Sequence, residues 1–87
     1  MSINKILKRK QWGSKIEVSW VDACSINGWK TVEEAKIILD EVYCYSRGWY
    51  VHHDKDFLVI CRDKGKTKNN DVAGVLYIPM KCIKKCK

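Results

Sequence analysis

The sequence has little of what marks membrane or exported proteins. It contains one proline, two histidines and no long hydrophobic run in its 87 residues. A membrane-spanning helix needs about 18 or more consecutive apolar residues, so we expect no membrane span and no membrane partner. The start, Met-Ser-Ile-Asn-Lys, lacks the apolar core of a signal peptide. These absences predict a cytoplasmic protein.

Signatures of catalysis are also missing. His52 and His53 are adjacent, and on a strand they would point to opposite faces, so they cannot act as a pair. The chain has no G-x-S-x-G sequence, no P-loop glycine pattern and no H-x-E sequence with paired cysteines. We therefore expect no catalytic residue, no cofactor and no enzyme activity.

The cysteines are five in number and show no C-x-x-C spacing. An odd count without an export signal predicts reduced thiols rather than a disulfide scaffold. Cys44 and Cys61 fall on strand-like runs and are expected to be small core residues. We expect no metal site. The alternative is a zinc ion bound by Cys82, Cys86 and one of the two histidines, because these cysteines are separated by only three residues.

Acidic residues are rare at both ends of the chain. Residues 1–15 hold five basic and no acidic residues, and residues 64–87 hold seven lysines and one aspartate. Residues 16–63 hold five basic and nine acidic residues. The basic ends are either solvated tails, a cationic rim for phosphate-bearing ligands, or surfaces that dock on the acidic centre of a second copy.

The length is that of one small domain. We expect residues 15–87 to form this domain and residues 1–14 to be a basic N-terminal arm. Ile3, Ile6 and Leu7 have the spacing of one helical turn. Because no capping signal precedes them, a short helix and a loose arm both stay open.

The sequence is rich in β-prone runs. The strongest signal is the stretch 48–62, in which two such runs flank Asp54-Lys55-Asp56 and predict a hairpin. Arg47-Gly48 interrupts an alternating pattern, which predicts a bend that lets one strand serve two faces. The predicted strands are 15–22, 42–53, 57–63, 72–78 and 82–86.

A capping box predicts one helix after the first strand. Thr31 and Glu34 have the spacing of this box, and the helix is expected over 32–38. Trp29, just before the cap, is either a hydrophobic lid on the helix or an exposed stacking ring. The inward positions are expected to be Ala35, Ile38 and Leu39.

The strands carry apolar residues on both faces, which favours closure into a barrel that removes the sheet edges. Pro79 must end the fourth strand, because proline has no N–H to donate. The stretch 74–83 resembles the end of SH3-type barrels, where a strand stops at Ile-Pro, makes one tight helical turn and enters the last strand. We predict a mainly β fold, a small five-stranded SH3-like or Sm-like barrel with one short helix after the first strand.

A wider pattern covers most of residues 15–85. It reads Val18-x-Trp20-x-Asp22-Ala23, Gly28-Trp29-x-x-x-Glu33-Glu34-Ala35, Gly48-Trp49, Asp56-x-Leu58-Val59-Ile60 and Gly74-x-Leu76-x-Ile78-Pro79. This pattern resembles a group of small, largely uncharacterised proteins encoded by tailed bacteriophages. The resemblance implies a phage-type accessory protein with a compact β-barrel, in the host-cell cytoplasm, and it supplies no catalytic residue.

Aromatic and basic residues together indicate binding of a phosphate-bearing ligand. A base can stack on an exposed ring while guanidinium or ammonium groups bind its phosphates. We expect a non-catalytic protein that sequesters an anionic nucleotide-like ligand, such as a host-defence signalling molecule, as a homo-oligomer. The alternatives are a nucleic-acid-binding accessory protein and an inhibitor that docks on a host protein. The expected ligand-binding residues are Trp29, Arg47, Trp49, His52, Arg62, Lys64 and Lys66.

Overall fold

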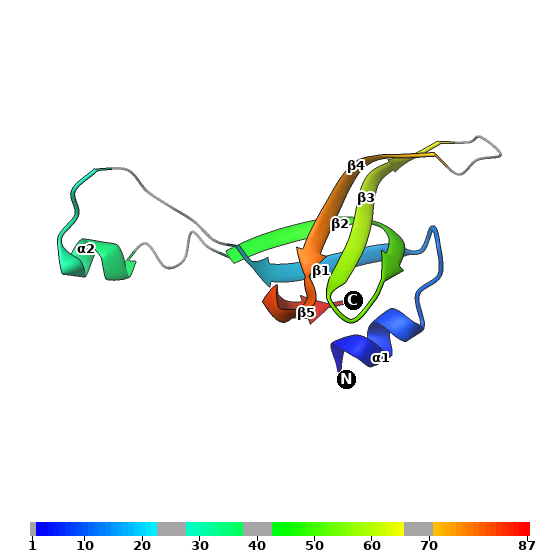
Figure 1. Ribbon diagram of the computed structural model, residues 1–87, viewed down its shortest axis with the longest axis horizontal. Coiled ribbons are helices and arrows are strands. Elements are labelled where there is room, and N and C mark those ends of the chain that lie inside the picture. Colours follow the sequence, from blue (N-terminus) through cyan, green and yellow to red (C-terminus); the bar gives the residue numbers. More distant parts are fainter. Residues whose placement is uncertain (1, 23–27, 38–42, 66–70) are drawn as a thin grey trace.

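The computed structural model describes residues 2–22, 28–37, 43–65 and 71–87, and they form a mainly β structure (Figure 1). Within these ranges, five antiparallel strands form one sheet in the order β4-β3-β2-β1-β5. No helix in them is long and apolar enough to cross a membrane. The elements in chain order are α1 (Ile3–Lys8), β1 (Lys15–Val21), α2 (Val32–Ile37), β2 (Tyr43–His53), β3 (Phe57–Lys64), β4 (Val72–Pro79), the 3₁₀ turn η2 (Met80–Cys82) and β5 (Ile83–Cys86).

All five predicted strands are confirmed, each to within one residue at the described ends. Pro79 is the last residue of β4, and the tight turn predicted after it is η2. The predicted closure is not seen in the described residues. There β4 pairs only with β3 and β5 pairs only with β1, so the sheet is open and has two edges.

β2 is a long strand that serves two partners. Residues 43–49 pair with β1, and residues 49–53 pair with β3. Gly48 lies at the changeover, where a Cβ atom would collide with the backbone carbonyl of Cys61. Only glycine allows this close approach of the two strands. The prediction of one long strand through Arg47-Gly48 is therefore confirmed, but the register irregularity of β2 lies between Tyr50 and His52 and not at Arg47-Gly48.

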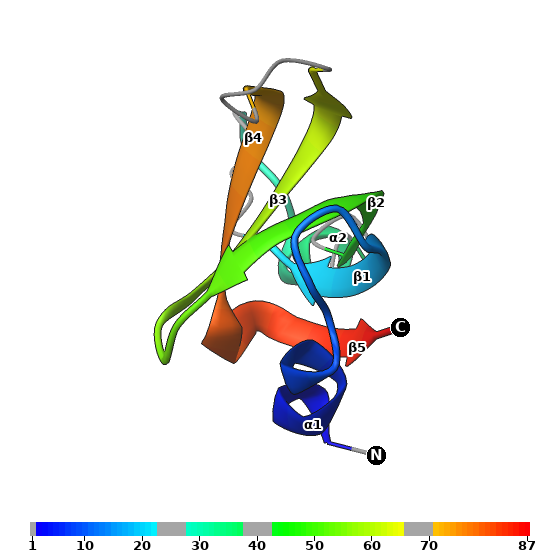
Figure 2. The same ribbon diagram turned by 90° about the vertical axis from the view of Figure 1, so that its right-hand side faces the viewer.

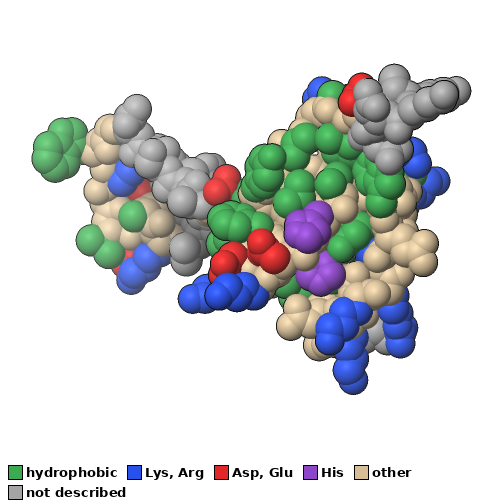
Figure 3. All heavy atoms as spheres, turned by 45° about the vertical axis from the view of Figure 1, so that its right-hand side comes forward, with side chains coloured by type: hydrophobic (Ala, Val, Ile, Leu, Met, Phe, Trp, Pro, Cys, Tyr) green, Lys and Arg blue, Asp and Glu red, His purple; other side chains and the backbone are tan. Residues whose placement is uncertain are grey.

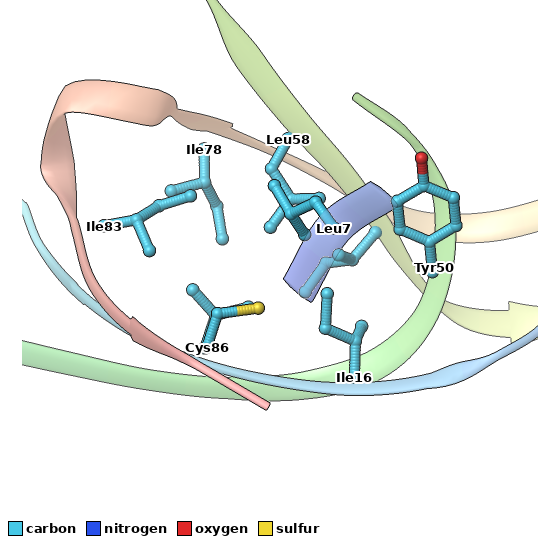
Figure 4. Packing of buried hydrophobic residues seen from close by; sticks show 9 residues of the cluster. Leu7, Ile16, Tyr50, Leu58, Ile78, Ile83 and Cys86 are labelled. Carbon is cyan, nitrogen blue, oxygen red and sulfur yellow. The ribbon is translucent and has the colours of Figure 1, made fainter. Parts of the chain in front are cut away.

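One face of the sheet, called the inner face here, holds the core (Figure 4). Leu7 of α1 is fully buried against this face, and α1 lies beside β5 (Figure 2). Ser2 caps α1 by accepting a hydrogen bond from the N–H of Lys5. The sequence left open a short helix or a loose arm for the first residues, and the structure shows the short helix. The buried cluster comprises Leu7, Ile16, Val18, Tyr50, Leu58, Ile60, Ile78, Ile83 and Cys86.

α2 lies apart from the sheet (Figure 1). Its cap is confirmed, because Thr31 Oγ1 accepts a hydrogen bond from the N–H of Glu34 at 3.1 Å. The prediction that Ala35 faces inward is wrong, since this residue is exposed, and positions 38–39 lie outside the described residues. Trp29 has a relative exposure of 100 %, so it is an exposed ring and not a lid on the helix. The capping box fixed the start of α2 but not what the helix packs on.

Candidate functional site

The outer face of the sheet, opposite the core, carries a stripe of large polar and aromatic side chains. Along β2, Tyr43, Tyr45, Arg47 and Trp49 occupy alternate positions, and the residues between them are turned toward the core. Arg47 and the two tyrosines are exposed, while Trp49 is half-buried. One strand therefore presents three rings and a guanidinium group on one surface.

Trp49 lies at the centre of the candidate site. Its neighbours across the sheet are Lys15 on β1 and Cys61 on β3. The Nζ atom of Lys64 lies 4.1 Å from the centroid of the Trp49 ring, and the Nζ atom of Lys15 lies 5.9 Å from it. Both distances are within the range of cation–π attraction. The indole thus holds two ammonium groups at the same place on the outer face.

An open groove of about 600 Å³ runs beside this ring and is called the Trp49 groove below. Its volume is that of a site for a small molecule. Four of its lining side chains are cations and one is a carboxylate, which makes the groove electropositive. The lining residues are Lys10, Lys15, Ile16, Glu17, Arg47, Gly48, Trp49 and Lys87.

Glu17 is the carboxylate in this groove, and its neighbours keep it ionised. A hydrogen bond with Tyr45 is the largest cause of its lowered pKa, and the charges of Lys87 and Arg47 lower it further. The same hydrogen bond raises the pKa of Tyr45. Lys87 Nζ lies 3.6 Å from Glu17 Oε2. Glu17 therefore offsets part of the positive charge of Lys87 and Arg47, and the groove keeps an excess of cations over carboxylates.

A second hollow of about 290 Å³, called the Arg47–Arg62 hollow, opens where β2 and β3 separate beyond Gly48. Arg47 lines both this hollow and the Trp49 groove. Arg62 Nε donates to Asp63 Oδ2 at 3.0 Å, an exposed pair that constrains the guanidinium group only weakly. Its other N–H groups can donate to a ligand. The remaining lining residues are Tyr45, Ser46, Ile60, Cys61, Gly74 and Leu76.

Four of the predicted ligand-binding residues gather around these two hollows. Arg47 and Trp49 line the groove, Lys64 lies over the Trp49 ring, and Arg62 lines the adjoining hollow. They meet because β2 and β3 approach each other closely at Gly48, next to the point where the pairing of the two strands ends.

The other three predicted residues are not part of this cluster. Trp29 lies on the exposed segment before α2 and lines neither hollow. His52 is exposed on the outer face, beyond a register shift between Tyr50 and His52, and it also lines neither hollow. Lys66 lies outside the described residues.

Sequence reasoning missed three lysines of the groove, Lys10, Lys15 and Lys87. Lys15 could have been found, because antiparallel pairing of the first two strands places its position opposite Trp49. Nothing in the local sequence around Lys10 or Lys87 indicates that these lysines lie in the groove. Lys10 is positioned by its Nζ donating to the carbonyl oxygen of Lys15 at 2.8 Å, and Lys87 by paired backbone hydrogen bonds with Glu17.

The alternative zinc site is not assembled. Among the residues that the structure describes, no three His, Cys, Asp or Glu side chains gather as metal ligands. Cys61, Cys82 and Cys86 are free thiols. Burial raises the pKa of Cys61 and of Cys86, which disfavours the reactive thiolate form of both.

Comparison with known proteins gives this chain no family. No protein-family model, no curated protein and no solved structure matches it. The likeness to small phage proteins therefore stays a prediction, and the geometry of the outer face is the main guide to function.

Proposed function

We propose that the protein is a non-catalytic binding module that captures and sequesters an anionic nucleotide-like ligand in the Trp49 groove. The observation that carries this proposal is the gathering of cations from four separate parts of the chain around one indole ring. Ammonium and guanidinium groups bind phosphate oxygens through charge-assisted hydrogen bonds. The cations are Lys10, Lys15, Arg47, Lys64 and Lys87.

Lys64 occupies a position over the ring on which a base would stack. A cation–π contact at an exposed site is worth about 0.5–1 kcal/mol. Stacking of a base on an aromatic side chain is worth about 1–3 kcal/mol. We therefore expect the base to displace the ammonium group of Lys64, which then becomes free to bind a phosphate oxygen. Trp49 holds this lysine in place until the ligand arrives.

The phage resemblance supplies the biological context. A phage-encoded accessory protein in the host cytoplasm would gain from sequestering a nucleotide-type host-defence signalling molecule, as a homo-oligomer. The strand order and the turn η2 after Pro79 support an SH3-like or Sm-like arrangement of the sheet.

A second candidate function is binding of single-stranded nucleic acid, and the outer-face stripe of β2 favours it. Tyr43 and Tyr45 are 63 % and 60 % exposed. Alternate residues of a strand lie roughly 6.6 Å apart, which lets successive unstacked bases meet successive rings. Lys85, opposite Ser19 in the sheet, adds an exposed cation on β5 beside this stripe.

Thermal melting with a ligand panel tests both candidates. The panel holds cyclic and linear nucleotides and a short single-stranded DNA, each at low and at high salt. We expect a nucleotide to raise the melting temperature at both salt concentrations, because a ligand that binds only the folded state stabilises it. A shift with DNA that disappears at high salt favours the second candidate. If no member of the panel shifts the melting temperature, both candidates are wrong.

A pair of matched variants locates the binding site. Arg47→Gln removes the guanidinium group shared by the two hollows, and it should weaken nucleotide binding about tenfold or more. Lys81→Gln removes an exposed charge on η2 outside both hollows and should leave binding within about twofold. Equal losses in the two variants would mean that only net charge attracts the ligand.

A further inference from the structure

The two edges of the open sheet differ in how well they resist pairing with another chain. β5 is a short edge of four residues and carries Lys84 and Lys85. Helix α1 lies alongside it (Figure 2). A short strand, edge lysines and a covering helix are all devices that prevent a sheet edge from pairing with a second chain.

The β4 edge has none of these protections over most of its length. It runs for eight residues without one charged side chain, and its proline stands only at the last position. Gly74, with a φ of 65°, interrupts the extended backbone near the start and leaves residues 75–79 as a continuous edge. Figure 1 shows β3 and β4 extending away from β1, β5 and α1. In the described part of the chain, β4 has a neighbouring strand on one side only.

Apolar side chains accompany this edge on the outer face. Tyr77, at the centre of residues 75–79, is 64 % exposed, and it lies opposite Val59 on β3. Phe57, two residues before Val59 on the same face, is 43 % exposed. Figure 3 shows hydrophobic side chains gathered beside the two histidines on this side of the molecule. Exposed apolar surface therefore borders the unpaired edge, and its burial against a partner would be energetically favourable.

We infer that the β4 edge pairs with the β4 edge of a second copy of this chain, antiparallel about a two-fold axis close to Tyr77. The sheets of the two copies then form one continuous sheet, and the two Tyr77 rings become cross-strand neighbours. This arrangement specifies the homo-oligomer of the proposed function. It leaves the Trp49 groove of each copy out of the contact, because β4 contributes no lining residue to that groove.

The charge distribution favours the β4 edge over the β5 edge for pairing between two copies. The chain carries a net charge of +7, so most pairs of surfaces of two copies repel each other. Antiparallel pairing of β4 with itself places no charged residue of the strand opposite another. Pairing of β5 with itself would bring Lys84 and Lys85 of both copies together at an edge that α1 already borders. The uncharged edge is thus the one along which two copies can approach.

Light scattering over a concentration series tests the inference with the whole chain. The wild type should show twice the chain mass of 10.2 kDa at high concentration and dissociate on dilution. Tyr77→Lys places like charges across the axis and should give a monomer at every concentration. Tyr43→Lys makes the same substitution at an equally exposed tyrosine on the central strand β2, and it should remain a dimer. A monomeric wild type, or equal behaviour of the two variants, would overturn the inference.

A charge-exchange experiment excludes misfolding as the cause. Tyr77→Lys and Tyr77→Glu should each be monomeric, with circular dichroism like that of the wild type. Their mixture should form a one-to-one dimer in native mass spectrometry, because opposite charges then face each other across the axis. No mixed dimer, or an assembly larger than a dimer, would contradict the two-fold pairing. A dimer that binds no nucleotide contradicts the proposed ligand capture alone. A monomer that binds one contradicts this inference and the oligomeric part of the proposed function, and leaves ligand capture standing.

Discussion

Neighbouring residues of β2 point to opposite faces of the sheet. The residues on the inner face pack in the hydrophobic core, whereas those on the outer face form the candidate site. Tyr50 is buried at 7 % exposure, and its hydroxyl lies 2.6 Å from Nδ1 of His53. Trp49, its predecessor, lies on the opposite face beneath the ammonium group of Lys64. Side chains of a strand alternate between faces, so stability and binding can be changed separately. Substitutions on the inner face should leave ligand binding nearly unaltered, and substitutions on the outer face should leave stability nearly unaltered.

The largest expected effect belongs to the inner face. Leu7→Ala removes a fully buried side chain that ties α1 to the sheet and should lower the free energy of unfolding by about 2–5 kcal/mol. Urea denaturation measures this change. Lys8→Ala, at the exposed next position, should change it by less than about 0.5 kcal/mol. Equal effects in the two variants would mean that α1 does not belong to the folded core.

Gly48 is the position where one substitution should change both stability and ligand binding. Gly48→Ala forces β2 away from the backbone of Cys61 and should lower the free energy of unfolding by about 1–3 kcal/mol. It should also weaken nucleotide binding, because Gly48 lines the Trp49 groove. Calorimetric melting and a ligand titration measure the two effects. A variant as stable as the wild type would show that the close approach of the two strands is not needed.

A change confined to the outer face should act on binding alone. Lys64→Met keeps most of the side-chain volume over Trp49 but removes the ammonium group, and should weaken nucleotide binding about tenfold. Its melting temperature should stay close to that of the wild type, since Lys64 is exposed. Lys55→Met, at the exposed tip of the β2–β3 hairpin, is the matched control. Weaker binding in both variants, by the same factor, would contradict a specific role for Lys64.

The smallest expected effect is a change in the pKa of Glu17 on the outer face. Tyr45→Phe removes the main cause of the lowered pKa of Glu17, so this pKa should rise toward its ordinary value. The wild-type pKa of Glu17 is lowered by folding, so any stability it adds is present above the unfolded pKa and lost as pH falls through the folded pKa. Because Glu17 is only partly buried and its partner Lys87 is exposed, this loss should be slight. NMR titration of the side-chain carboxyl carbon measures the pKa, with Tyr43→Phe as a control that should leave it unchanged.

The strands could be predicted from the sequence because their signals are local. Alternation along β1 and β2, the hairpin around Asp54 and the stop at Pro79 each depend on a few consecutive residues. The side chain of Asp54 accepts hydrogen bonds from the N–H groups of Asp56 and Phe57, as the turn composition suggested. Gly48 stood out as a break in the alternation, but the pattern predicted a bend there and not the close approach to Cys61 that requires glycine.

What could not be predicted depends on contacts between distant segments. Lys10 reaches the groove through its hydrogen bond to the carbonyl oxygen of Lys15, and Lys87 because β5 pairs with β1; no local pattern reveals either contact. Ala35 was predicted to face inward because its spacing suits a helix with one buried face. In the structure, α2 lies apart from the sheet and Ala35 is exposed. The open sheet likewise depends on how far the strands curl, which alternation does not determine.

The separation of the two faces is tested most directly by an amide NMR titration of the wild-type chain with the nucleotide that most raises its melting temperature. Signals of Lys15, Arg47 and Trp49, including the indole N–H, should move with the ligand, while those of Leu7 and Ile78 on the inner face stay in place. Movement confined to the inner face or to α2, or no movement at saturating nucleotide, would contradict the assignment of ligand binding to the Trp49 groove.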